Sequence, residues 1–218
     1  MPVNEDFFKV WNPKMAYVLG FFCADGAMTI NPRGSKYIEF NITDAGLLLE
    51  IKQSLGAHQT ITRRSYNKGK DTYRLQIGSK ELFTDLLAMG LTPKKTFRFE
   101  MPPVPAPLFS HFVRGYFDGD GNVWSGLLHK ERKTPLLTLR TLFTSGNEKF
   151  LIQLSEYLEN HLSIKGYFGY SSGAHRLVYA AKSSLFLYRF MYTDMANNLF
   201  LDRKKKVFEK YVANAAVV

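Results

Sequence analysis

Several features are scarce in this 218-residue chain, and each absence excludes a class of protein. The chain has one cysteine, Cys23, which forms no intrachain disulfide and fits a buried position in a reducing compartment. No apolar run reaches the roughly 18 residues of a membrane-spanning helix. The first residues lack the basic and then apolar pattern of a secretory signal. We therefore expect an intracellular protein, in a bacterial cytoplasm or an organelle, that does not bind membranes.

Acidic side chains are also scarce relative to basic ones. The chain has 29 Lys and Arg residues against 19 Asp and Glu residues, a net charge of +10. This charge favours a polyanionic partner, with nucleic acid ahead of an anionic membrane. The 45% of apolar residues and 15% of aromatic residues are enough to build a core. The composition therefore predicts a folded protein that binds nucleic acid.

Two stretches of the chain share one pattern. Residues 18–26 read Val-Leu-Gly-Phe-Phe-Cys-Ala-Asp-Gly, and residues 113–121 read Val-Arg-Gly-Tyr-Phe-Asp-Gly-Asp-Gly, 95 positions later. Each stretch predicts an apolar helix that ends at its last glycine. Small residues recur four positions apart on one face of each helix: Gly20, Ala24, Gly115 and Gly119. Because small residues let helix backbones approach closely, we predict that these two helices form the interface between two halves.

Similar elements follow each stretch. Ile38, Phe40 and Ile42 alternate with polar residues and predict a half-buried strand. The apolar positions 47, 48, 51 and 55 of the next predicted helix recur 103 positions later as 150, 151, 154 and 158. We predict an α+β chain of two αββαββα copies, with an N-terminal half at 1–89, a proline-rich linker at 90–107 and a C-terminal half at 108–218.

The predicted packing brings Asp25 and Asp120 together, each at the carboxyl end of its helix. A helix dipole is negative at this end, and the two carboxylates repel each other. A divalent cation between them resolves both problems, and carboxylates with backbone carbonyls suit Mg²⁺. An Asp-Gly pair after one apolar helix is ordinarily a capping turn. Two equivalent pairs in a basic, duplicated chain instead favour metal-dependent phosphodiester hydrolysis.

Both stretches resemble the LAGLIDADG motif of homing endonucleases, and the likeness covers nearly the whole chain. The resemblance implies two pseudo-symmetric halves that pack through the motif helices, each with a saddle-shaped antiparallel sheet for the DNA major groove. It also implies a monomeric, Mg²⁺-dependent endonuclease that makes a staggered cut at a long asymmetric site. The sixth motif position is Cys23 in one copy and Asp118 in the other, and this position is not the essential ligand in the family.

The resemblance also implies roles for particular residues. Asp25 and Asp120 correspond to the metal ligands, with the carbonyl groups of Ala24 and Gly119 as possible further ligands. The other implied catalytic positions are a water-ordering residue at the end of the second strand of each half and a lysine after the last helix of each half. The matching residues are Asp44, Ser145, Lys95 and Lys204, with Lys94 and Lys205 as rivals for the two lysines.

Outward-facing side chains of the predicted strands are candidates for contact with DNA. Arginine donates to guanine, and amide side chains pair with adenine. The candidates are Thr29, Asn31, Arg33, Tyr37, Glu39, Asn41, Arg64, Arg74, Gln76, Trp124, Thr138, Arg140 and Tyr179. A solvated sheet face is also polar, which is the alternative for any one of them. Trp124 and Tyr179 have packing in the core as a second alternative.

Three other functions remain open at the level of sequence, and the weakest is a structural protein that binds membranes through its basic face. The same fold serves RNA maturases, which bind intron RNA and assist splicing, and non-catalytic proteins that bind DNA. Loss of a motif acid would favour a non-catalytic protein, and both acids are present here.

Overall fold

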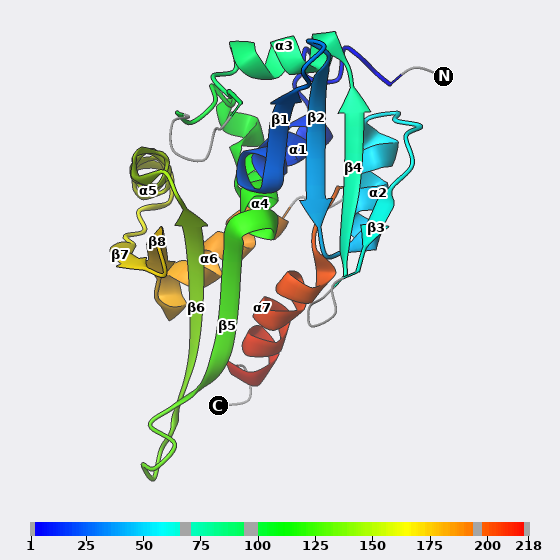
Figure 1. The fold of residues 1–218 in the computed structure, drawn as a ribbon. Coiled ribbons are helices and arrows are strands. Elements are labelled where there is room, and N and C mark those ends of the chain that lie inside the picture. Colours follow the sequence, from blue (N-terminus) through cyan, green and yellow to red (C-terminus); the bar gives the residue numbers. More distant parts are fainter. Residues whose placement is uncertain (1–2, 66–70, 94–99, 194–197, 216–218) are drawn as a thin grey trace.

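The computed structural model describes residues 3–65, 71–93, 100–193 and 198–215 (Figure 1). The first half contains α1 (Pro13–Asp25), β1 (Gly26–Ile30), β2 (Lys36–Ile42), α2 (Ala45–Ser54), β3 (Thr62–Arg64), β4 (Thr72–Gly78) and α3 (Lys80–Ala88). The second half begins with the short helix η2 (Ala106–Leu108). It continues through α4 (Phe109–Asp120), β5 (Gly121–Leu128), β6 (Leu136–Ser145), α5 (Glu148–Leu162), β7 (Tyr167–Ser171), β8 (Ala174–Tyr179), α6 (Ala181–Tyr192) and α7 (Asp202–Ala215). The described elements therefore repeat in the predicted order.

Each half folds into one four-stranded antiparallel sheet. The strand orders are β1-β2-β4-β3 and β5-β6-β8-β7, so the two sheets have the same topology. In β2, the side chains of Ile38, Phe40 and Ile42 are buried on the helix-covered face, as their alternation predicts. The α+β class and the two related halves are confirmed.

The motif helices α1 and α4 lie side by side between the two sheets (Figure 1). A Cβ atom on Gly20 would collide with the carbonyl oxygen of Phe112, and one on Gly115 would collide with that of Tyr17. Only glycine permits this backbone contact. The prediction that small residues let the two helices pack closely is therefore correct.

The ends of α1 follow from its local sequence. The side chain of Asn12 accepts a hydrogen bond from the amide of Met15, and Pro13 occupies the first turn, where its missing N–H costs no helix hydrogen bond. At the other end, the helix stops at Gly26, whose backbone is extended and begins β1. The acid before this glycine therefore lies where helix, strand and interface meet.

Cys23 is buried, in agreement with its predicted role as a small apolar residue. No helix in the described part of the chain is both long enough and apolar enough to cross a membrane.

Candidate active site and nucleic-acid interface

Asp25 is the last residue of α1, and Asp120 is the last residue of α4. A Cβ atom on Gly119 would lie 3.4 Å from Oδ2 of Asp25, so the first carboxylate lies against the residue that precedes the second acid. Burial raises the pKa of the nearby Tyr116 well above its usual value, and the charges of Asp120 and Asp25 raise it further. The two motif acids thus share one electrostatic environment, although they are 95 positions apart.

A cavity of about 460 Å³ opens beside Asp25. Its walls come from both halves: the motif ends contribute Asp25 and Gly119, and β2 contributes Asn41. Two arginines, Arg64 of β3 and Arg203 of α7, complete a polar rim. Arg203 was not predicted as a site residue, and its signal in the sequence is its place beside Lys204 in a basic run. The cavity combines a carboxylate with cationic groups that can bind phosphate.

Lys204 extends from α7 to the carboxyl end of α4. Its Nζ atom donates to the carbonyl oxygens of Phe117 (2.6 Å), Asp118 (2.9 Å) and Gly121 (2.6 Å), and it lies 3.5 Å from that of Gly119. Burial lowers the pKa of Lys204 to about 8, although the charges of Asp118, Asp25 and Asp120 oppose this shift. The ammonium group therefore neutralises the negative end of one motif helix.

The two lysines that compete in the second basic run have different surroundings. Lys204 is 5% exposed, whereas Lys205 lies along its own helix and pairs with Glu209 at 2.7 Å. Of the two, Lys204 is therefore the one near the motif acids. Their first-half counterparts, Lys94 and Lys95, lie outside the described residues.

The structure changes the expectation for Asp44. Strand β2 ends at Ile42, and Asp44 instead caps α2, where its Oδ1 accepts the amide of Leu47 at 3.0 Å. Local N-capping therefore engages this carboxylate. Ser145 ends β6, but it is buried and its Oγ accepts the amide of Asn147 at 3.0 Å. Neither side chain lines the cavity beside Asp25.

The donor set at the motif ends fits Mg²⁺. Asp25 and Asp120 offer two carboxylates. Ala24 and Gly119, each directly before one of these acids, offer backbone carbonyls. Within the described ranges, no group of three or more His, Cys, Asp or Glu side chains could hold a metal. Mg²⁺ does not need such a cage, because it is commonly bound by one or two carboxylates, waters and substrate phosphates. The residues present suit a metal site that nucleic acid completes.

Behind the second motif end lies a buried polar network. Oδ2 of Asp118 accepts hydrogen bonds from the Tyr17 hydroxyl at 2.7 Å and the Leu201 amide at 2.8 Å. The neighbouring Arg114 is fully buried and donates to the carbonyls of Leu199 at 2.9 Å and Met191 at 2.6 Å. Burial raises the pKa of Asp118 to about 6, and the charges and hydrogen bonds around it limit the rise. This network ties the segment before α7 to α4.

Strand register decides which predicted DNA-contact residues share a face. In the first sheet, Thr29 is opposite Tyr37, Glu39 is opposite Gln76, and Asn41 is opposite Arg74. Arg64 lies on this outer face too, because it is opposite Thr72, two residues from Arg74. Asn31 and Arg33 lie in the β1–β2 turn, where Oδ1 of Asn31 accepts the amide of Arg33 at 3.0 Å.

The second sheet brings Trp124 and Arg140 opposite each other, with Thr138 two residues away on the same face. Tyr179 does not belong to this set. It is opposite Thr141 on the core side, and both side chains are fully buried. The expectation that Tyr179 faces DNA is therefore wrong, and its packing alternative is correct. Because Val178 and Tyr179 are both apolar, alternation along β8 did not reveal which of them points inward.

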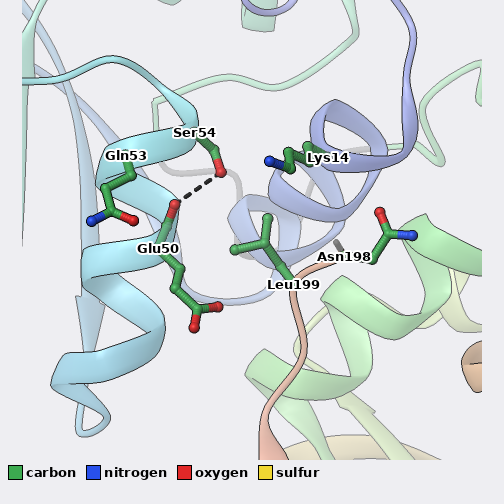
Figure 2. A pocket seen from close by; sticks show the side chains of 6 residues that line it. All are labelled: Lys14, Glu50, Gln53, Ser54, Asn198 and Leu199. Atoms are coloured by element: carbon green, nitrogen blue, oxygen red, sulfur yellow. Dashed lines mark hydrogen bonds between the residues drawn. The ribbon is translucent and has the colours of Figure 1, made fainter. Parts of the chain in front are cut away.

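A second cavity, of about 330 Å³, lies near the start of α1 (Figure 2). Lys14, Glu50 and Asn198 contribute to its lining, together with Gln53, Ser54 and Leu199. Lys14 and Asp25 are near opposite ends of α1, which corresponds to about 16 Å along a helix. None of the predicted site residues lines this cavity.

Comparison with known proteins supports the same interpretation. Residues 12–89 match the family model described as a LAGLIDADG-like domain. The homing endonuclease I-WcaI, solved with its DNA recognition sequence, superposes with a TM-score of 0.65 at 14% identity, covering 93% of this chain and 90% of that chain. The meganuclease I-SmaMI, solved with uncleavable DNA, gives 0.66 at 16% identity, covering 95% and 89%. By sequence, no curated protein matches the chain.

These matches show the fold of the chain. The chain shares the fold of LAGLIDADG homing endonucleases over 93–95% of its length, and residues 12–89 match the model of a LAGLIDADG-like domain. The resemblance inferred from the paired motifs is confirmed.

Proposed function

We propose that the chain is a site-specific endonuclease of double-stranded DNA that uses Mg²⁺ and makes a staggered cut at a long, asymmetric target. The observation that carries this proposal is that Asp25 and Asp120 end α1 and α4, where the Asp25 carboxylate lies against Gly119, the residue before Asp120. DNA-bound neighbours of the same fold and the net charge of +10 support the choice of substrate. Such an enzyme acts on DNA inside the cell.

In this proposal, the motif ends bind the metal and orient the scissile phosphates. Asp25 and Asp120 would hold Mg²⁺, which would activate water for attack and stabilise the negative charge that develops on the phosphate. Lys204 keeps a cation at the end of α4, beside the position that the phosphates would take. Arg64 and Arg203 can bind backbone phosphate at the rim of the cavity.

The proposed enzyme works as a monomer, since one chain supplies both acids and both sheets. We propose residues 1–89 and 108–218 as the two domains, joined by the linker at 90–107. Each sheet then contacts one half-site, and the catalytic acids lie between them.

The test joins the sequences that flank the gene into one uninterrupted duplex and incubates it with the protein and Mg²⁺. Double-strand cleavage at a single position, abolished by a chelator, is the expected result. Absence of any cut would overturn the proposal. Tight binding to intron RNA without DNA cleavage would instead identify a maturase.

A further inference from the structure

The two sheets present different chemistry at equivalent positions of their outer faces. Gly26 is opposite Phe40 in the first sheet, and Gly121 is opposite Phe143 in the second. Phe40 and Phe143 are in turn opposite Leu75 and Leu177. These pairs align the outer positions of one sheet with those of the other. In this alignment Thr29 corresponds to Trp124 and Glu39 to Leu142. Likewise, Arg74 corresponds to Arg176 and Gln76 to Val178.

In the first sheet, these positions form one polar cluster around Glu39. Its Oε2 accepts from Nε of Arg74 at 2.9 Å, and its Oε1 lies 2.7 Å from Nη2 of the same guanidinium. Oε1 also accepts from Nε2 of Gln76 at 2.7 Å and from Oγ1 of Thr29 at 3.1 Å. Glu39 as a whole residue is 8% exposed, and four donor atoms surround its carboxylate. Glu39 therefore has little capacity left to accept a hydrogen bond from a base.

Arg74 keeps donors that Glu39 does not use. A guanidinium has five N–H groups, and Glu39 engages its Nε side. Three terminal N–H groups remain, and one from each terminal nitrogen can form the pair that reads O6 and N7 of guanine in the major groove. Because the ion pair immobilises the side chain before DNA arrives, less conformational entropy is lost on binding.

In the second sheet, the same positions are mainly apolar. Leu142 replaces Glu39, Val178 replaces Gln76, and Trp124 is 45% exposed on the outer face. Arg176 has Leu142 where Arg74 has Glu39, and its buried Nε has no hydrogen-bond partner among the residues that the structure describes. An exposed apolar surface on a DNA-facing sheet matches the one apolar group of the major groove, the C5-methyl of thymine.

We propose that the two sheets read their half-sites by different chemistry. The first sheet selects a guanine through Arg74, which Glu39 holds in position, and the second sheet selects thymine methyl groups through Trp124, Leu142 and Val178. This inference rests on the proposed function, and it makes Glu39 a positioning residue rather than a base-contacting one.

The first experiment uses the unaltered protein. Duplexes are selected for binding from a randomised pool, and thymine is then replaced by uracil in one half-site at a time, which removes only the methyl groups. Replacement in the half-site of the second sheet is expected to weaken binding about threefold to fivefold for each buried methyl group. Replacement in the other half-site is the matched control and is expected to have no effect. Equal effects in both halves would overturn the inference.

The second experiment is a double-mutant cycle of Glu39→Gln and Arg74→Ala, read as base preference in the selected pool. Arg74→Ala is expected to abolish one guanine preference. Glu39→Gln is expected to weaken the same preference about tenfold and to have no further effect when Arg74 is absent. If Glu39→Gln alters base preference equally in both backgrounds, Glu39 reads a base itself and the positioning role is wrong.

The two proposals fail in distinguishable ways. Recovery of no preferred duplex from the pool would overturn both the proposed function and this inference. Recovery and cleavage of a preferred duplex without the guanine and methyl dependences would overturn this inference alone. Thermal melting of each variant shows whether a lost preference reflects unfolding, and the uracil experiment decides the inference without any variant.

Discussion

The carboxyl ends of the two motif helices are alike at the interface and different behind it. Both end in an acid followed by glycine. Behind the acid, α4 carries Asp118, Arg114 and His111, whereas the positions 95 residues earlier on α1 are Cys23, Leu19 and Ala16. The partner of Asp118 on α1 is Tyr17, whose counterpart on α4 is Phe112.

This difference separates two roles within one duplicated motif. The acids and close-packed glycines are retained in both copies, because the proposed metal site and the helix contact require both. The layer behind them differs, and on α4 it anchors the segment that leads into α7, through Leu199 and Leu201.

The interface acids should be equally essential. Asp25→Asn and Asp120→Asn should each reduce double-strand cleavage by at least about a thousandfold, because each removes one of two charged metal ligands. Conversion of supercoiled plasmid to nicked and linear forms measures this loss, and DNA binding in a mobility-shift assay should persist. Full activity of either variant would contradict the shared site.

The residues behind the two acids should contribute unequally to the stability of the two halves. Asp118→Ala should lower the free energy of unfolding by about 3–5 kcal/mol, because it leaves Arg114 and Lys204 buried without their carboxylate. Cys23→Ala, at the equivalent position of α1, should cost about 1 kcal/mol. Urea denaturation of both variants measures the difference. Similar losses in the two variants would show that the buried network contributes no special stability.

The two glycines of the contact between α1 and α4 should contribute equally to stability. Gly20→Ala and Gly115→Ala should each cost about 3 kcal/mol, since the new methyl group meets a backbone carbonyl of the other helix. Gly169→Ala is the control, because a Cβ there has no neighbour within 4 Å in the described part of the chain. Thermal unfolding measures all three variants. Unchanged stability of Gly20→Ala would contradict the close packing of α1 and α4.

The smallest expected effect is a change in stability at acid pH, which Glu39 on the first sheet should cause and Leu142 on the second sheet should not. Burial raises the pKa of Glu39, but hydrogen bonds and charge from Arg74, with Thr29 and Gln76, outweigh burial and hold the pKa below its usual value of 4.5. A depressed pKa means that this stabilisation is present above pH 4.5 and is lost as pH falls through the folded-state pKa.

Glu39→Gln should therefore remove about 1 kcal/mol or less at neutral pH, and it should flatten the acid limb of the stability curve. Leu142→Ala, on the second sheet, should lower stability without changing the shape of that limb. Urea denaturation between pH 3 and pH 7, chosen to span roughly the range of carboxylate titration, measures both variants. An unchanged acid limb in Glu39→Gln would contradict the depressed pKa.

The sequence by itself determined the features that depend on local spacing. The Asp-Gly ends, the four-residue spacing of small residues and the repeated order of elements predict the motif helices, their contact and the nearness of Asp25 and Asp120. Alternation identifies the inner face of β2, because neighbouring side chains of a strand point to opposite faces.

Only the tertiary structure decided the features that depend on distant partners. Lys204 rather than Lys205 enters the core because α7 packs against β5 and β6 with Lys204 directed to the end of α4, and Tyr179 points inward because β8 pairs with β6 in one register. Glu39 acquires its role from Arg74 and Gln76 on another strand. Local pattern gives the face and the ends of an element, whereas cross-strand register and helix docking are set by packing of the whole core.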